Sequence, residues 1–186
     1  MRDRQHGASP PAEREQLHTR RYHFEGFRRT DSLWDIEGRI IDTKHYAFEN
    51  RDRGTVQPGQ PLHEMAVRLT LDDDFVVHDI VADTMASPFS ICSGVTPNYR
   101  NLIGAQIGPG WRKALRQAVG GSDGCTHITE MLGAMGTVAY QTYVSDSDSS
   151  NRDGKPRRSS LVNSCHAFAA DGPLVKEFWP DQYTGE

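Results

Sequence analysis

The hydrophobic pattern changes from strand-like to helix-like near residue 86, and this order restricts the fold more than any other feature of the sequence. Residues 33–46 alternate apolar with charged side chains, as is typical of a half-buried strand. Two further β-rich runs, 63–71 and 75–85, are joined by three consecutive aspartates and predict a hairpin. Strands followed by helices predict an α+β domain in which helices cover one face of an antiparallel sheet.

Three helices are expected after this hairpin. They run from Thr96 to Ile103, from Trp111 to Val119, and from about 123 to 144. The third is the longest, and its apolar residues recur at the helical period, which predicts that one face packs on the sheet. That stripe consists of Ile128, Met131, Leu132, Met135, Val138 and Thr142.

One core, residues 21–144, is expected between less regular segments. Residues 1–20 form an Arg-rich, proline-interrupted sequence that predicts a flexible arm. Residues 145–160 are rich in Ser and Asp without apolar periodicity, which indicates a mobile linker or loop. Residues 161–186 predict a hairpin-like segment packed on the core, with its turn at Asp171-Gly172.

Composition excludes several classes of protein. The formal net charge of −4 gives no overall attraction to nucleic acid or to an anionic membrane. No apolar run approaches the ~18 residues of a transmembrane helix, and the N-terminal sequence lacks a secretory signal. Three widely spaced cysteines argue against a disulfide framework. We therefore expect a cytoplasmic protein with reduced thiols and no nucleic-acid or membrane partner.

The start of the longest helix is the first candidate site. Cys125, Thr126 and His127 fall in its first turn, where unpaired backbone N–H groups and the helix dipole favour negative charge. Such a position lowers the pKa of a cysteine and attracts anions. The alternative is a buried structural cysteine beside an ordinary helix cap.

A carboxylate–imidazole pair is the second candidate site. If the three aspartates form the hairpin loop, His63 lies opposite Asp83 at the end of an apolar face. A carboxylate that fixes the tautomer of a histidine is the usual support of a general base. The pairing depends on register, because a slip of one residue places Ala82 opposite His63. The alternative is a polar strand end near solvent.

Several sequence motifs of enzymes are absent. There is no glycine-rich phosphate loop, no GxSxG, no HExxH and no CxxC. We therefore expect acid–base chemistry on a small organic substrate, with no cofactor and no metal. Asp35 and Glu37 share a strand face with Arg39, which fits either substrate contacts or a solvated charge ladder.

A set of short motifs resembles a known family. The motifs are Leu33-Trp34-Asp35-Ile36-Glu37-Gly38, Asp42-Thr43-Lys44, Pro61-Leu62-His63-Glu64-Met65, Pro109-Gly110-Trp111, Gly124-Cys125-Thr126-His127 and Cys165-His166. Together they resemble the bacterial family catalogued as domain of unknown function 2889, from about residue 20 to 183. The resemblance implies occurrence in bacteria that degrade aromatic compounds.

The sequence is also distantly similar to iron–sulfur scaffold proteins of the NifU type. Cys125 would match a helix-opening cysteine of the scaffold, and Asp83 lies near another ligand position. The scaffold's Cys-Gly pair is absent, because Met85-Ala86-Ser87 occupies that region. A shared fold supports only analogy in function.

The resemblance and the residues together favour a cofactor-independent lyase acting on an aromatic compound, such as a lignin-derived dimer, with retro-aldol release of formaldehyde as one form. In this hypothesis His63, oriented by Asp83, is the base, and we expect its ring to converge with that of His127 on one cavity. Thr126 and His127 hold the developing anion, and Cys125 lines the pocket. Trp34, Tyr99 and Trp111 supply aromatic walls, and Asp35 and Glu37 add substrate contacts.

The alternative is a metal-binding or iron–sulfur-binding protein with Asp83, Cys125 and His127 as ligands. The expected partner is a small aromatic substrate, and a homodimer is left open.

Overall fold

The computed structural model describes residues 12–149 and 161–186, and the side chains of 144–149 are not among its described parts. The chain divides into two compact units, Met1–Ser145 and Asp146–Glu186. The first unit contains a four-stranded antiparallel sheet and helices. The expected α+β class is confirmed.

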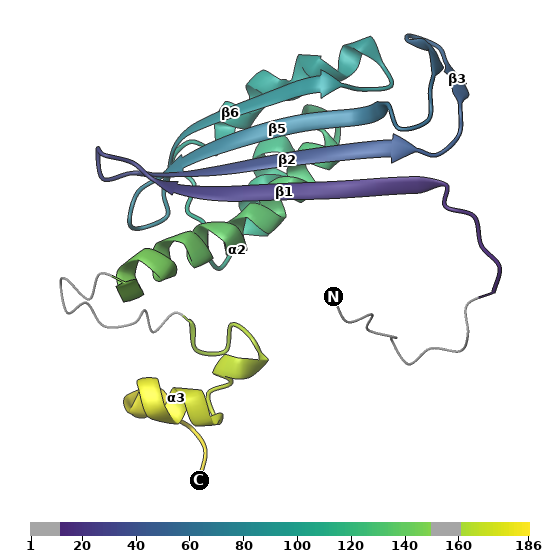
Figure 1. Cartoon of the computed structure of the whole chain (residues 1–186). Helices are drawn as coiled ribbons and strands as arrows, with labels where there is room; N and C mark the ends of the chain where they lie inside the picture. Colours follow the sequence, from purple (N-terminus) through teal and green to yellow (C-terminus); the bar gives the residue numbers. More distant parts are fainter. Residues whose placement is uncertain (1–11, 150–160) are drawn as a thin grey trace. The chain divides into compact units, whose positions relative to one another are not determined.

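The sheet has the strand order β1-β2-β5-β6, and each neighbouring pair is antiparallel (Figure 1). A two-stranded hairpin of β3 and β4 follows β2 in the sequence. Strands β2 and β5 are central, so their alternation decides which side chains enter the core. The strands are β1 His18–Arg28, β2 Trp34–Lys44, β3 Phe48–Asn50, β4 Gly54–Val56, β5 Pro61–Leu71 and β6 Val77–Ala86.

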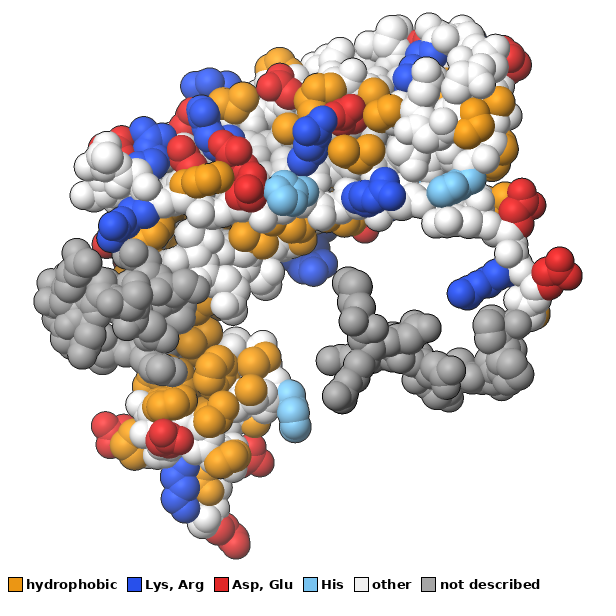
Figure 2. All heavy atoms as spheres, in the orientation of Figure 1, with side chains coloured by type: hydrophobic (Ala, Val, Ile, Leu, Met, Phe, Trp, Pro, Cys, Tyr) orange, Lys and Arg blue, Asp and Glu red, His pale blue; other side chains and the backbone are white. Residues whose placement is uncertain are grey.

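Alternation along the central strands gives the sheet one buried face and one open face. Ile36 and Ile40 of β2 are fully buried, whereas Glu37 and Arg39 between them are exposed. Figure 2 shows basic and acidic side chains interspersed over the sheet, as expected for its solvated face. The buried face of the two strands consists of Trp34, Ile36, Ile40, Met65, Val67, Leu69 and Leu71.

Helices cover the buried face of the sheet (Figure 1). The longest helix, α2, buries Ile128, Met131, Leu132 and Met135 of the predicted apolar stripe, each contributing about 1.5–3 kcal/mol, while Val138 and Thr142 are partly buried. Gly110, with φ of 102°, lies at the N-cap of α1, a conformation that favours glycine. The helical segments of this unit are η1 Ser90–Leu102, α1 Trp111–Val119, η2 Gly121–Asp123 and α2 Thr126–Ser149.

Strand β1 approaches helix α2 closely at Gly26. A Cβ atom at this position would overlap the side chain of Thr142, with Cγ2 only 2.6 Å away. Glycine therefore lets the edge strand lie against the helix, and this contact holds β1 over the end of the core.

The second unit is helical where a hairpin was expected. Its segments are η4 His166–Phe168, α3 Pro173–Phe178 and η5 Pro180–Gln182, and no strand occurs in the described range 161–186. The prediction of a terminal hairpin is therefore wrong. Gly172 is the N-cap of α3, and Pro173 opens the helix because an N–H is not needed in the first turn.

The flanking segments of the first unit also differ from the expectation. Residues 18–20, assigned to a flexible arm, begin β1, while 1–11 lie outside the described residues. Residues 145–149 of the expected linker continue α2, and 150–160 are not described. No helix in the described ranges is long and apolar enough to cross a bilayer.

Candidate functional site

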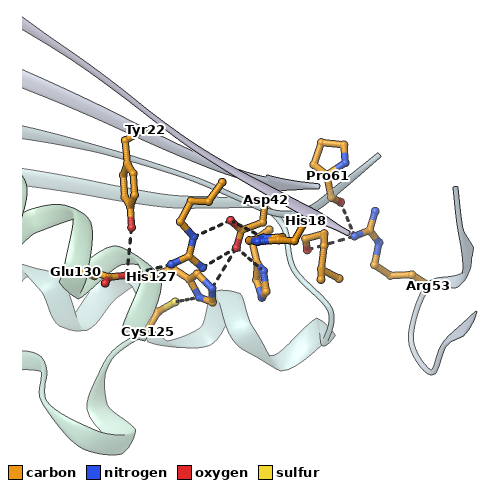
Figure 3. Close-up of polar contacts among 11 residues, drawn as sticks. His18, Tyr22, Asp42, Arg53, Pro61, Cys125, His127 and Glu130 are labelled. Atoms are coloured by element: carbon orange, nitrogen blue, oxygen red, sulfur yellow. Dashed lines mark hydrogen bonds and ion pairs between the residues drawn. The ribbon is translucent and has the colours of Figure 1, made fainter. Parts of the chain in front are cut away.

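A buried carboxylate, Asp42, lies at the centre of the candidate site. The alternation that turns Ile36 and Ile40 of β2 toward the helices turns Asp42 to the same side. Its side chain is only 2% exposed. Because burying an ionised carboxylate is unfavourable by several kcal/mol, it needs donors close by. They come from β1, β5 and α2 (Figure 3).

Arg20 of β1 is the strongest of these partners. It lies directly opposite Asp42 in the β1–β2 register, and its guanidinium donates two hydrogen bonds to the carboxylate. Arg20 Nε donates to Oδ1 at 2.7 Å and Nη2 donates to Oδ2 at 2.8 Å. His18 Nε2 lies 3.3 Å from Oδ1 on the same side. This paired geometry is the one that guanidinium and carboxylate groups favour.

The protonation state of Asp42 follows from these contacts. Burial alone would raise the pKa of Asp42, but the hydrogen bonds and positive charge of Arg20 outweigh it, so the pKa lies below its usual value. The carboxylate is therefore ionised at neutral pH, and the pKa of Arg20 is raised by the same hydrogen bonds.

Two imidazoles face the second oxygen of Asp42. His63 of β5 places Nδ1 3.2 Å from Oδ2, and His127, in the first turn of α2, places Nε2 3.4 Å from it. The two rings stack with 3.9 Å between centroids and 29° between planes. The expected approach of the two rings is confirmed, whereas neither ring lines the groove described below. His63 Nδ1 is buried and finds no hydrogen bond of good geometry among the described residues.

Both imidazoles are held in their neutral form. Burial, followed by the neighbouring ring of His127, lowers the pKa of His63 to about 4, despite the attraction of Asp42. Burial also lowers the pKa of His127, and the charge of Arg20 adds to this effect. Each ring therefore carries one unprotonated nitrogen at pH 7, as a general base or a metal ligand requires.

Cys125 adjoins this pair at the start of α2. Its Sγ lies 3.8 Å from His127 Nδ1. The buried Tyr99 fixes the backbone here, because its hydroxyl accepts a hydrogen bond from Cys125 N at 2.8 Å and contacts Cys125 O at 3.0 Å. Glu130, one turn further along α2, accepts hydrogen bonds from Arg20 Nη1 and the Tyr22 hydroxyl, each at 3.1 Å (Figure 3).

Three of these residues are spaced to hold a metal ion. Asp42, His63 and His127 each offer a ligand atom, and the three atoms lie within 4.8 Å of one another. Two imidazoles and one carboxylate form a donor set that suits zinc or ferrous iron. The buried His63 Nδ1 without a hydrogen bond fits such a ligand, whereas the two Arg20 hydrogen bonds compete with a metal for Asp42.

An open groove of about 760 Å³ adjoins the site between helices α1 and α2. Cys125, Thr126 and Glu130 line it from α2, and Arg112 and Arg116 line it from α1. Tyr22 of β1 also lines it. The imidazole pair does not line this groove, so Cys125 is the link between the two features.

Comparison with known proteins gives one result. A model of the family described as "Protein of unknown function (DUF2889)" matches residues 18–141, which include every strand of the sheet and the first turns of α2. The chain belongs to the DUF2889 family. No curated protein and no solved structure matches it.

The expected partnership of His63 and Asp83 does not occur in this DUF2889 structure. Ala66, which follows His63 by three residues on β5, lies opposite Asp83. Because side chains alternate between the two faces along a strand, this displacement by an odd number of residues places Asp83 on the open face of the sheet. His63 lies opposite Asp42 of β2 instead. The prediction was wrong because β6 is displaced after the aspartate loop, with register shifts at both ends of the β5–β6 pairing.

The aromatic residues proposed as substrate walls belong to the core of the DUF2889 domain. Trp34, Tyr99 and Trp111 are all less than 10% exposed. Trp34 Nε1 donates to Asp73 Oδ1 and Trp111 Nε1 donates to Leu132 O. None of the three lines the groove.

Two acidic residues proposed as substrate contacts lie on the open face of the sheet. Asp35 accepts hydrogen bonds from Thr70 at 2.6 Å and from Arg29 at 3.2 Å, and Glu37 is exposed. This is the solvated side of the strand, away from the face that carries Asp42. Glu37 fits the alternative of a solvated ladder, whereas Asp35 is only 18% exposed and is held by Thr70 and Arg29.

The sequence interpretation missed Asp42 and Arg20 as site residues. One signal was available, because Asp42 is a carboxylate that continues the even-numbered, largely apolar series of β2 directly after Ile40. Arg20 had no such signal, since it becomes a partner only through the pairing of an edge strand whose first residues, 18–20, were assigned to the flexible arm.

Proposed function

We propose that this DUF2889 protein is a carbon–carbon lyase that performs acid–base chemistry on a small aromatic compound. One observation carries the proposal: two neutral imidazoles stack on each other, and both face one oxygen of a buried, ionised carboxylate. General bases that act near neutral pH need an unprotonated nitrogen in a position fixed by its neighbours. The substrate class is supported by the resemblance to a family found in bacteria that degrade aromatic compounds.

His63 is the proposed base. Its Nδ1 faces Asp42 Oδ2, so a proton on Nδ1 is stabilised by the carboxylate and the lone pair is placed on Nε2. Asp42 therefore has the orienting role that the sequence interpretation gave to Asp83. His127, Thr126 and the backbone N–H groups at the start of α2 are the proposed donors to the developing anion.

The reaction is written for a substrate with a hydroxymethyl group. His63 Nε2 takes the hydroxyl proton, the carbon–carbon bond to the hydroxymethyl carbon breaks, and formaldehyde leaves. The electron pair stays on the remaining carbon, which takes the proton back from the imidazolium. No electron is gained or lost overall, so the step needs no redox partner.

Formaldehyde release tests this function. Purified protein is incubated with a panel of lignin-type aromatic dimers that carry a hydroxymethyl group, and formaldehyde and the shortened product are measured together. We expect turnover by the wild type and a loss of at least about 100-fold in His63→Gln, since a positioned base contributes 10²–10⁴ in rate. His23→Gln is the matched control, because His23 is an exposed imidazole on β1 that pairs with Glu25. Absence of formaldehyde across the panel contradicts the lyase.

A metal-binding function is the second candidate. The close approach of ligand atoms from Asp42, His63 and His127 favours it, and the ligand set differs from the expected Asp83, Cys125 and His127. A metal ion held there would polarise a substrate oxygen as a Lewis acid. The hydrogen bonds of Arg20 to both Asp42 oxygens rank this candidate below the metal-free base.

Metal analysis separates the two candidates. Protein purified without chelator is assayed for bound metal, in the wild type and in His63→Ala, His127→Ala and Cys125→Ala. Stoichiometric metal that is lost in both histidine variants and kept in Cys125→Ala supports the metal centre. Formaldehyde release by protein that contains no metal, unchanged by added chelator, supports the lyase as written.

A further inference from the structure

The groove between α1 and α2 carries an unbalanced positive charge on one wall. Arg112 and Arg116 lie one helical turn apart on α1 and both line the groove. Neither makes an ion pair or a side-chain hydrogen bond with any residue of the described ranges. Like charges at this spacing repel by a few tenths of a kcal/mol, so an anion between them would be stabilising.

The carboxylate on the other wall does not neutralise these arginines. Glu130 directs its carboxylate to Arg20 Nη1 and the Tyr22 hydroxyl, and its single negative charge faces the two positive charges of Arg112 and Arg116. The rest of the lining is neutral, with apolar side chains such as Leu115 and Val119 on the floor. The groove therefore combines two free guanidinium groups with an apolar surface.

We propose that this groove binds a small organic acid, with its carboxylate held by Arg112 and Arg116 and its apolar body on the floor toward Cys125. Guanidinium groups bind carboxylates through paired hydrogen bonds, which fixes the orientation of a planar acid. Tyr22 lines the same groove and offers an aromatic surface to the body of the ligand. The ligand class is thus a carboxylate-bearing, largely apolar molecule.

The position of Cys125 connects this groove to the imidazole pair. Cys125 lines the groove, and its Sγ lies 3.8 Å from His127 Nδ1. An acid anchored at Arg112 and Arg116 would therefore extend toward the site. The inference that this acid is the substrate of the lyase rests on the proposed function. The binding of the acid to the groove does not.

Alkylation of Cys125 tests the charge of the groove. Iodoacetate and iodoacetamide modify a thiol by the same reaction and have similar size, but only iodoacetate carries a carboxylate. Peptide mass spectrometry gives the rate at each cysteine for both reagents at pH 7.5. We expect the ratio of the iodoacetate rate to the iodoacetamide rate at Cys125 to fall at least about threefold in the double variant Arg112→Gln/Arg116→Gln. Because intrinsic thiol reactivity affects both reagents, the ratio reports the groove.

Two controls belong to this experiment. Lys113→Gln removes a positive charge from α1 at an exposed position that does not line the groove, so the ratio should stay as in the wild type. Cys165 is exposed and gives a reference ratio within the same molecule, which should not change in any variant. An equal ratio at Cys125 in the wild type and the double variant overturns the proposal.

Direct binding provides a second, independent measurement. Benzoate and its neutral counterpart benzamide are titrated into ¹⁵N-labelled protein. We expect benzoate to shift the backbone amides of Gly120, Gly121 and Gly124, with binding at least about fivefold weaker for benzamide and abolished in Arg112→Gln/Arg116→Gln. Equal binding of both compounds, or no binding of benzoate, overturns the proposal. A protein that binds benzoate in this way but releases no formaldehyde contradicts the lyase alone.

Discussion

The rings of His63 and His127 stack with their centroids 3.9 Å apart while both face the same oxygen of Asp42. His63 comes from the beginning of β5 and His127 from the beginning of α2, so the pair exists only when the helix is docked on the sheet. Two protonated imidazoles at this distance would repel, and burial disfavours the charged form of each. The stacking therefore couples the protonation state of the site to the packing of the domain.

This coupling predicts that stability declines in mild acid. Folding lowers the pKa of His63 from 6.5 to about 4, so between these values the unfolded chain binds a proton that the folded site resists. The stabilisation that results from keeping His63 neutral is fully present above pH 6.5 and is lost as the pH falls toward 4. The free energy of unfolding decreases by at most about 3 kcal/mol over this range. Asp42 acts in a lower window, since its pKa lies below 3.8 in the folded state.

Urea unfolding from pH 7 to pH 4 measures this effect. We expect a shallower decline in the free energy of unfolding for His63→Gln than for the wild type. His23→Gln should decline like the wild type, because His23 is exposed on the edge strand. Parallel declines in all three proteins would contradict the assigned role of His63.

Arg20 is predicted to be essential for the stability of the buried carboxylate. Arg20→Met removes both hydrogen bonds to Asp42 and leaves its charge uncompensated. Loss of one partner of a buried pair costs roughly 3–5 kcal/mol, and the partial exposure of Arg20 reduces this to about 2–4 kcal/mol. Arg21→Met, on the open face of the same strand, should change stability by less than about 0.5 kcal/mol.

The Arg20 prediction is checked by chemical denaturation of both single variants and of Arg20→Met with Asp42→Asn. The double variant removes the charge and should recover part of the loss. No difference between Arg20→Met and Arg21→Met would show that the pair contributes nothing to stability.

Strands β2, β5 and β6 and helices α1 and α2 could be predicted because their side chains report burial directly, whereas β1, β3 and β4 were not predicted. Alternation marks β2, the aspartates mark the loop between β5 and β6, and the apolar period marks α2. The register of β6 could not be read in this way, because loop geometry and the bulges next to it decide which residue faces His63. That is why the sequence led to Asp83 instead of Asp42.

Only part of the candidate site could be predicted from the sequence, for a related reason. His127 and Cys125 fall at a helix start that the sequence defines, and His63 falls at a strand start, so all three were found. Arg20 and Asp42 meet through an edge strand with weak apolar alternation, in which most residues are exposed. Only pairing in three dimensions reveals that the arginine neutralises the carboxylate.

Tyr99 is predicted to stabilise the start of α2 instead of binding substrate. Its hydroxyl accepts from Cys125 N and lies 3.1 Å from the Thr129 hydroxyl. Tyr99→Phe leaves the Cys125 N–H without this partner, which costs about 1–3 kcal/mol in a buried position. Tyr22→Phe, which removes one exposed hydroxyl contact to Glu130, should cost less than about 0.5 kcal/mol.

Thermal unfolding of the two tyrosine variants tests this prediction, and hydrogen exchange at the Cys125 amide shows where any loss arises. Faster exchange at Cys125 is expected in Tyr99→Phe only. Unchanged exchange there would mean that the hydroxyl does not hold the helix start.

The close approach of β1 to α2 gives a last prediction, on how the edge strand is held. Gly26→Ala places a methyl group against the Thr142 side chain, whose Cγ2 lies 2.6 Å from the ideal Cβ position. Overpacking of this kind costs about 1–3 kcal/mol. Because β1 also carries Arg20, a strand displaced at Gly26 should loosen the pair with Asp42.

Gly94→Ala is the matched control, since a Cβ atom there meets nothing within 4 Å. Denaturation should show a loss for Gly26→Ala alone, and the double variant Gly26→Ala/Thr142→Gly should recover most of it by opening the space. Because Thr142→Gly also weakens α2 by about 1 kcal/mol, recovery is judged against that single variant. If Gly26→Ala is as stable as the wild type, β1 can move away from α2 freely, and its hold on Arg20 must come from pairing with β2 alone.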